Sequence, residues 1–297
     1  MTAEATSRPE SRTVLVAMRA AIPSLPPSER RVAEAFLDDP AAASALSIAE
    51  LADACAVSTT SVVRFYRRIG YTRFKDLRMD LTREITRENL ENASFSAVSG
   101  DIDRADTLED IVSKVALNET LSISDTVKTL DIAALGAAVQ AVLGAGRIDI
   151  FGVGASSVVG LDLQQKLSRI GRTALTWPDA HAAWTAATVL GKNATAIAIS
   201  HSGDTVDTVE FLALAAASGA TTIAITNFDS SPLAARADVV LTTAARETRF
   251  RSGALGSRIA QLMVIDCLFT GVAQASYDES IEALRKTYAA VHSRTVG

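Results

Sequence analysis

The chain has 297 residues, of which 48% are hydrophobic, so it is long enough for two domains and apolar enough to fill a sizeable core. Its net charge of −5 excludes a protein that is basic over its whole surface, yet six basic residues stand against one acidic residue between Thr59 and Arg78. No signal-peptide pattern is visible, and Asp266 or glycine breaks the longest apolar runs before the ~20 residues that a membrane span needs. Two cysteines far apart in apolar patterns fit reduced thiols, so we expect a cytoplasmic protein without a membrane partner.

The hydrophobic periodicity changes along the chain and divides it into segments. Residues 12–88 follow a helical pattern throughout, whereas residues 89–106 are polar and aperiodic, which indicates a linker. Residues 107–133 contain connecting helices, and strands alternate with helices over residues 134–276. A last helical pattern covers residues 277–297. We therefore predict an all-α domain followed by an α/β domain.

Within the first domain, the segment from Ile48 to Ile69 has the pattern of two helices joined by a tight turn. Ser58 is placed to cap the second helix, and Ala56 holds a turn position often taken by glycine, at a cost of about 1 kcal/mol for a left-handed alanine. An ordinary three-helix unit with a solvated basic face is the alternative. The apolar positions recur at the offsets that a helix-turn-helix uses for packing, and they are Leu51, Cys55, Val57, Val62 and Phe65.

The outward face of the second helix combines hydroxyl groups with guanidinium groups. Because arginine suits guanine edges and phosphates while serine and threonine suit either, this face can enter the major groove of DNA. The residues predicted to contact DNA on this face are Ser58, Thr59, Thr60, Ser61, Arg64, Arg67 and Arg68.

In the second domain, short apolar runs that indicate buried strands alternate with helical patterns. Such alternation predicts a five-stranded parallel sheet with right-handed crossovers and helices on both faces. Ligands bind at the carboxyl ends of the strands in folds of this kind, so loops 152–157 and 200–205 are candidate sites. The predicted strands are residues 147–151, 173–176, 194–199, 221–226 and 239–241.

Loop 200–205, Ser-His-Ser-Gly-Asp-Thr, has the chemistry of an anion-binding turn. Its hydroxyls and its glycine stand where a strand passes into a helix, and the N–H groups and dipole of a helix start favour negative charge. We therefore predict that Ser200, Ser202, Gly203 and Thr205 bind a phosphate group without a metal or a cofactor.

Loop 152–157, Gly-Val-Gly-Ala-Ser-Ser, begins like a dinucleotide-binding fingerprint. The third glycine of that fingerprint is replaced by Ser157, and the acid that would close the second strand, Asp179, lies beyond the strand's end. We therefore favour Ser156 and Ser157 as further donors to an oxygen-rich ligand over nucleotide binding.

Both halves of the chain resemble one family of regulators. Residues 62–71, Val-Val-Arg-Phe-Tyr-Arg-Arg-Ile-Gly-Tyr, followed by Phe-Lys-Asp-Leu-Arg at 74–78, resemble the helix-turn-helix of the RpiR family. The two serine-bearing loops resemble the SIS, or sugar isomerase, domain over about residues 134–275, together with Ala-Ile-Thr-Asn at 224–227 and Arg-Ile-Ala-Gln-Leu at 258–262. A helix-turn-helix before a SIS domain is the arrangement of RpiR-type regulators.

The resemblance implies roles for particular residues. Lys75 would contact the DNA backbone, loop 200–205 would hold a sugar phosphate, and loop 152–157 would contact its phosphate or its sugar hydroxyls. Glu247 is a further candidate for a sugar hydroxyl, while roles for His181 and His201 stay open.

These observations predict a transcriptional regulator, a homo-oligomer (dimer or tetramer), whose SIS domain senses a phosphorylated sugar and alters operator binding. The main alternative is a sugar-phosphate isomerase, which needs a base beside the substrate carbonyl. His181, His201 and Glu247 keep that alternative open, but none forms a catalytic constellation in the sequence, so we assign no catalytic residue. A SIS-based scaffold with a helical domain that does not bind DNA is the weaker alternative. No cluster has the spacing of metal ligands.

Overall fold

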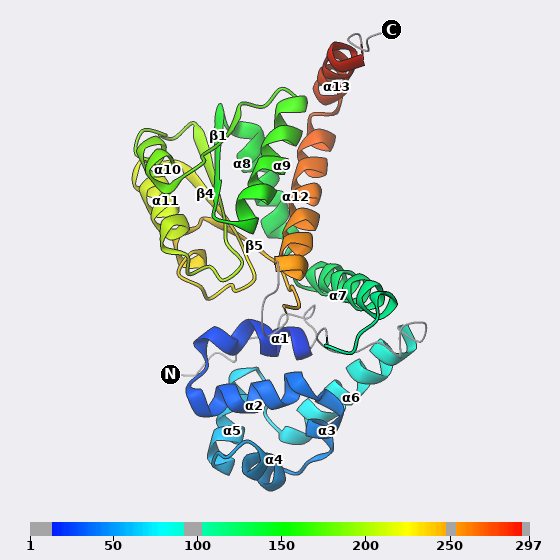
Figure 1. Cartoon of the computed structure of the whole chain (residues 1–297). Coiled ribbons are helices and arrows are strands. Elements are labelled where there is room, and N and C mark those ends of the chain that lie inside the picture. Colours follow the sequence, from blue (N-terminus) through cyan, green and yellow to red (C-terminus); the bar gives the residue numbers. More distant parts are fainter. Residues whose placement is uncertain (1–13, 92–102, 248–253, 293–297) are drawn as a thin grey trace. The chain divides into compact units, whose positions relative to one another are not determined.

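The computed structural model describes residues 14–91, 103–247 and 254–292, which fall into two compact units that divide between Asn118 and Glu119. The first unit is helical (Figure 1). Its elements are α1 (Val14–Ala21), the 3-10 helix η1 (Ile22–Ser24), α2 (Pro27–Asp38), α3 (Pro40–Ala45), α4 (Ile48–Ala54), α5 (Thr59–Arg68) and α6 (Phe74–Glu91).

One apolar cluster holds the helical unit together. Phe36 of α2, Leu51 of α4, Phe65 of α5 and Leu77 of α6 are all fully buried in it. The rings of Phe36 and Phe65 stack with their centroids 6.1 Å apart, which adds a specific aromatic contact to the burial. Helix α5, which carries the predicted DNA-binding residues, is therefore held in place by the apolar side chains on its buried face.

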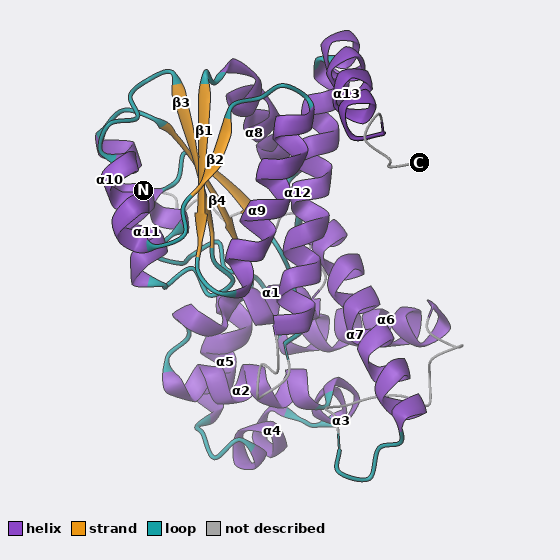
Figure 2. Cartoon of the chain, turned by 45° about the horizontal axis from the view of Figure 1, so that its top comes forward, coloured by secondary structure: helices purple, strands orange, loops and turns teal. Residues whose placement is uncertain are grey.

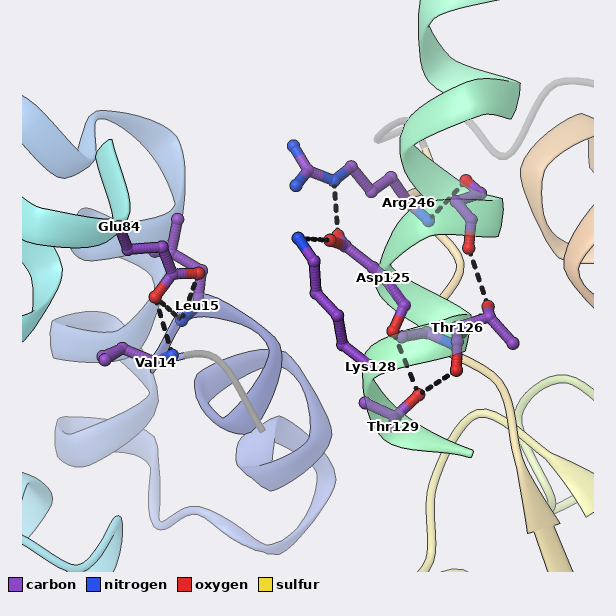
Figure 3. A network of polar contacts seen from close by, with 10 residues as sticks. Val14, Leu15, Glu84, Asp125, Thr126, Lys128, Thr129 and Arg246 are labelled. Carbon is purple, nitrogen blue, oxygen red and sulfur yellow. Dashed lines mark hydrogen bonds and ion pairs between the residues drawn. The ribbon is translucent and has the colours of Figure 1, made fainter. Parts of the chain in front are cut away.

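A carboxylate fastens the first helix of this unit to the last one. Glu84 of α6 accepts hydrogen bonds from the backbone N–H groups of Val14, at 2.7 Å, and Leu15, at 3.4 Å (Figure 3). A negative charge at a helix N-terminus satisfies donors that have no partner inside the helix and interacts favourably with the helix dipole. This contact closes the helical unit around its core.

The second unit is an α/β domain with a parallel sheet in the order β2-β1-β3-β4-β5. Helix α7 (Leu108–Thr129) starts before the division between the units and continues past it. The elements that follow are α8 (Ile132–Gly144), β1 (Arg147–Gly152), α9 (Ala155–Arg169), β2 (Ala174–Thr176), α10 (Ala180–Ala187), β3 (Ala194–Ile199), α11 (Val206–Ala217), β4 (Thr221–Thr226), η2 (Ala234–Arg236), β5 (Val239–Thr242), α12 (Leu255–Ala275) and α13 (Tyr277–His292).

Helices cover both faces of the sheet. Figures 1 and 2 show α8, α9 and α12 on one face and α10 and α11 on the other. The first face buries branched side chains such as Ile148 and Ile150, and the second buries small ones such as Ala196 beside Phe151 and Phe211. The predicted two-domain fold, with a five-stranded parallel sheet flanked by helices, is confirmed.

Two segments differ in detail from the sequence pattern. Helix α6 runs to Glu91, into the range predicted as a linker, and residues 92–102 lie outside the described part of the chain. The predicted C-terminal helix appears as α13, and residues 293–297 also lie outside it.

Helix α12 is long and apolar enough, by length and composition alone, to cross a membrane, although it contains Asp266 and two glycines. That differs from the expectation that no apolar stretch reaches this length. In this domain its residues Ala260, Val264 and Leu268 are fully buried, and Val264 and Leu268 pack in the core beside the sheet. Its apolar composition is therefore that of a core helix.

Candidate functional site

The turn between α4 and α5 is a Schellman motif with alanine at its left-handed position. The Val57 N–H donates to the carbonyl of Ala52 at 2.9 Å, and the Ala56 N–H donates to that of Asp53 at 3.0 Å. Ala56 has φ +50°, in the region that favours glycine. The strain that the sequence predicts at this turn is therefore present in the structure.

The first turn of α5 uses some of the predicted DNA-contacting hydroxyls for its own structure. Ser58 Oγ accepts a hydrogen bond from the Ser61 N–H at 3.2 Å and lies 3.1 Å from Ser61 Oγ, so Ser58 is the N-cap. Thr59 and Thr60 on the same turn are exposed. Ser58 is exposed as well, but its hydroxyl is engaged in the cap.

The basic residues of this face fall into two groups. Arg64 and Arg67 of α5 are exposed, and so is Lys75 in the first turn of α6. Arg68 instead forms an ion pair through Nε with Oε2 of Glu29 in α2 at 2.7 Å, where the Glu29 side chain is only 4% exposed. Arg68 therefore fastens α5 to α2, a role that the sequence pattern does not indicate.

The parallel sheet places the two candidate anion loops beside each other. Strands β1 and β3 are neighbours with Gly152 in register with Ile199, so loops 152–157 and 200–205 leave adjacent strand ends. A Cβ on Gly152 would lie 2.9 Å from the Ile199 carbonyl oxygen and 3.0 Å from the backbone of Ser156. Glycine is therefore required where the first loop passes the second strand.

Loop 200–205 is folded around its own hydroxyl groups. The Oγ of the buried Ser200 accepts a hydrogen bond from the Gly203 N–H at 3.1 Å and lies 3.1 Å from Thr205 Oγ1. Ser202 is half-buried and donates to the carboxylate of Asp204. The predicted phosphate-binding hydroxyls thus lie in one turn, already paired with neighbours in the loop.

Two helices begin at these loops without a side-chain cap. Helix α9 follows Gly154, which has no side chain, and α11 follows Thr205, whose side chain makes no capping hydrogen bond. By contrast, Asp131 caps α8 and Asp179 caps α10, where the carboxylate accepts from the Ala182 N–H at 2.9 Å. In the first turns, the N–H groups of Ser156, Ser157 and Thr208 already donate to backbone carbonyls, so those of Ala155, Val206 and Asp207 are the donors that an anion can satisfy.

The serines of loop 152–157 have different surroundings. Ser156 is buried, and its Oγ donates to Oε1 of Gln261 in α12 at 3.3 Å, while the exposed Ser157 donates to the Gly154 carbonyl at 2.7 Å. Gln261 is 1% exposed, and its Nε2 has no hydrogen-bond partner among the residues that the structure describes. The sequence gives no role to Gln261; the available signal was one amide on the buried face of an apolar helix.

The three residues whose roles the sequence leaves open lie in separate surroundings. Glu247 follows β5, and its Oε1 accepts a hydrogen bond from the Ser257 N–H in the first turn of α12 at 2.6 Å, so the carboxylate caps that helix. His181 is exposed in the first turn of α10. The ring of His201 packs edge-on against Phe228, with centroids 5.8 Å apart.

Asn227 is a buried polar residue beside the site that sequence reasoning missed. Its Oδ1 accepts hydrogen bonds from Thr243 Oγ1 at 3.0 Å and from the Ala245 N–H at 2.7 Å, and its own N–H donates to the His201 carbonyl at 3.1 Å. The signal for it was its position directly after a buried strand, the position that Ser200 takes after β3.

Comparison with known proteins assigns a family model to each unit. A model for a helix-turn-helix domain of the rpiR family matches residues 13–88, and a model for the SIS domain matches residues 142–271.

Relatives match over nearly the whole chain. An uncharacterized HTH-type transcriptional regulator of Caldanaerobacter subterraneus is 36% identical over 95% of this chain and 98% of its own length. The structure of Vibrio vulnificus NanR complexed with ManNAc-6P is similar with a TM-score of 0.60 at 28% identity, covering 96% of this chain and 100% of that one. The sugar isomerase domain of an RpiR transcription factor from Sphaerobacter thermophilus matches with a TM-score of 0.55 at 26% identity, over 60% of this chain and 97% of that one. The chain therefore belongs to the RpiR family of helix-turn-helix transcriptional regulators, with a SIS domain as its second unit.

Proposed function

We propose that the chain is a cytoplasmic, homo-oligomeric regulator that binds operator DNA through α5 and a phosphorylated sugar through loops 152–157 and 200–205. The observation that carries the sensing half is the pair of uncapped helix N-termini, α9 and α11, beside hydroxyl groups at the ends of neighbouring strands. Backbone N–H groups and hydroxyls in this arrangement bind phosphate without a metal. The similarity to NanR, which was solved with ManNAc-6P, supports a sugar phosphate over a free anion.

The proposed DNA surface is the exposed side of α5 with Lys75 of α6. Thr59, Thr60, Arg64 and Arg67 offer hydroxyl and guanidinium donors for bases and phosphates. A symmetric oligomer would place two such helices on two half-sites of an operator. Because the whole chain has a net charge of −5, we expect the affinity for DNA to depend on this basic face and to fall steeply with salt.

The effector changes DNA affinity only if it binds one arrangement of the protein more tightly than another.

We propose a sensor rather than an isomerase. In this structure the carboxylate of Glu247 is held by the Ser257 N–H at the start of α12, and the His201 ring packs on Phe228. These contacts favour a structural role for both candidate bases over proton transfer.

The test is a thermal-shift panel on the full chain with ManNAc-6P, other hexose 6-phosphates, unphosphorylated ManNAc and inorganic phosphate. A sugar phosphate at 100 times its dissociation constant should add about 2.7 kcal/mol of stability. Ser202→Ala should reduce that shift, whereas Ser218→Ala, the same change at the other end of α11, should leave it unaltered.

The panel has two outcomes that would contradict the proposal. A full shift in Ser202→Ala would place the phosphate away from loop 200–205. Sustained interconversion of a ketose and an aldose phosphate by the wild-type protein, abolished by Glu247→Gln, would establish the isomerase instead.

A further inference from the structure

Thr242, the last residue of β5, and the residues after it form an extended segment, 242–247, which we call the strap. It runs along the second half of α7, where Arg246 contacts Asp125 (Figure 3). Its alternate residues have different partners. In an extended chain, successive residues face opposite sides. The even-numbered residues of the strap bond to α7, and the odd-numbered residues 243 and 245 bond to Asn227.

On the α7 side, the strap follows one face of the helix. Thr242 Oγ1 donates to the Thr129 carbonyl at 3.2 Å, and the Ala244 N–H donates to Thr126 Oγ1 at 3.0 Å. The Arg246 N–H donates to Ser122 Oγ at 3.1 Å. Ser122, Thr126 and Thr129 share a helix face because they are four and three residues apart, and the side chains of all three are buried.

A charged contact adds to these bonds. Arg246 Nε donates to Oδ2 of Asp125 at 2.8 Å, and Lys128 Nζ lies 3.5 Å from the other carboxylate oxygen (Figure 3). The Asp125 side chain is only 1% exposed, so its charge depends on these two cations. The strap and α7 are therefore joined by hydrogen bonds and an ion pair whose acceptor residues on α7 are all buried.

On the other side, Asn227 joins the strap to loop 200–205. Its side-chain oxygen accepts from Thr243 and Ala245, while its backbone N–H holds the carbonyl of His201, at 3.1 Å. Thr226 Oγ1 donates to the same carbonyl at 3.3 Å. A shift of His201 that keeps these buried bonds must move Asn227 with it.

We propose that Asn227 and the strap carry the state of loop 200–205 to α7. This inference rests on the proposed function, because it takes the loop to be the place where the phosphate binds. A phosphate that takes the hydrogen of the Ser200–Thr205 bond, or the Gly203 N–H that donates to Ser200, breaks a contact that now holds the loop and so shifts it. Helix α7 continues without a break from Thr129 back to Leu108, across the division between the two units, so a shift at its end is transmitted along a rigid element.

Thr126 and Thr129 supply a matched pair of variants. Thr126→Val removes the acceptor of the Ala244 N–H. The Thr129 hydroxyl donates to carbonyls of its own helix, and Thr129 contacts the strap through its backbone carbonyl. Thr129→Val is therefore the matched control. Thr126→Ser keeps the hydroxyl and serves as the rescue. Ser122→Ala, which removes the acceptor of the Arg246 N–H, is a second uncoupling variant should Thr126→Val fold poorly.

The experiment is hydrogen–deuterium exchange on the full-length protein with saturating ManNAc-6P and, in parallel, inorganic phosphate. We expect either probe to protect residues 200–206 in wild type and in every variant, and to change exchange in residues 119–129 in wild type, Thr129→Val and Thr126→Ser. In Thr126→Val and Ser122→Ala the response of residues 119–129 should be lost while the loop response persists.

The outcomes separate the inference from its premise. A loop that responds to neither probe in wild type contradicts the proposed function, and the inference with it. A loop response without any change in residues 119–129 of wild type, or an undiminished change in the two uncoupling variants, overturns the route through the strap and leaves the proposed function standing.

Discussion

The face of α5 and loop 200–205 present their polar groups in opposite ways. On α5, Arg64 and Arg67 are exposed and lie outside the apolar core of the unit. In the loop, Ser200 and Gly203 are buried, and the bonds among Ser200, Gly203 and Thr205 hold the turn in shape. The DNA face can therefore be altered at little cost to stability, whereas the same atoms of the effector loop serve both folding and recognition.

The largest effect is expected at Gly203. Its φ is +66°, and a Cβ there would overlap Ser231 and lie 2.8 Å from Thr226 Oγ1. Gly203→Ala should lower the free energy of unfolding by about 3 kcal/mol, the sum of left-handed strain and overpacking. Urea denaturation followed by two probes measures this free energy. The thermal shift produced by a sugar phosphate should disappear in the variant.

The control for this variant is Gly171→Ala. Gly171 has φ +80°, but a Cβ there meets no atom within 4 Å, so only the backbone strain of about 1 kcal/mol applies. Equal losses in the two variants would show that the packing of Gly203 on its neighbours contributes nothing.

On the DNA side, Arg64 and Arg68 should behave differently although both belong to the predicted contact set. Arg68→Ala leaves the buried Glu29 carboxylate without its partner and should cost about 1–2 kcal/mol of stability. The expected cost is smaller than for a fully buried ion pair because the Arg68 side chain is 49% exposed. Arg64→Ala should leave stability within about 0.5 kcal/mol and weaken operator binding by about 1–3 kcal/mol.

Thermal unfolding and fluorescence anisotropy, with an operator selected in vitro by the wild-type protein, measure the two quantities. Arg67→Ala is the exposed control for stability. A stable Arg68→Ala protein with weakened DNA binding would instead assign Arg68 to the DNA face, in the way that the sequence alone suggests.

The smallest effect tests the turn of the helix-turn-helix. Helices α4 and α5 both end in Schellman motifs, with Ala56 at φ +50° in the first and Gly70 at φ +94° in the second. Ala56→Gly should stabilise the protein by about 0.5–1 kcal/mol, because relief of strain exceeds the entropy that glycine gains in the unfolded chain. Gly70→Ala should destabilise by a similar amount, and a loss in both variants would rule out strain at Ala56.

The sequence was sufficient where the signal is local. Strands 194–199 and 221–226 agree with β3 and β4 residue for residue, because buried parallel strands are continuous apolar runs between turns. The cap at Ser58 and the strained Ala56 followed from turn chemistry that involves only neighbouring residues. The apolar length of α12 was underestimated, because one acid and two glycines do not prevent a helix from being buried along one side.

The roles that the sequence missed all depend on contacts between distant segments. Arg68 meets Glu29 across 39 positions, Ser156 meets Gln261 across 105, and Arg246 meets Asp125 across 121. Nothing in the local pattern distinguishes these polar side chains from solvated ones. Their partners exist only after the helices pack.

The sequence by itself determined the two-unit order, the parallel sheet, and the two hydroxyl-bearing loops at its strand ends, since these depend on hydrophobic period and turn chemistry. Only the tertiary structure decided which hydroxyls and charges are already paired. The register of β1 with β3 brings the loops together, and the packing of α7 against the strap joins Asn227 to that helix. The physical reason is that a buried polar group needs a hydrogen-bond partner, and the tertiary fold determines which distant segment supplies it.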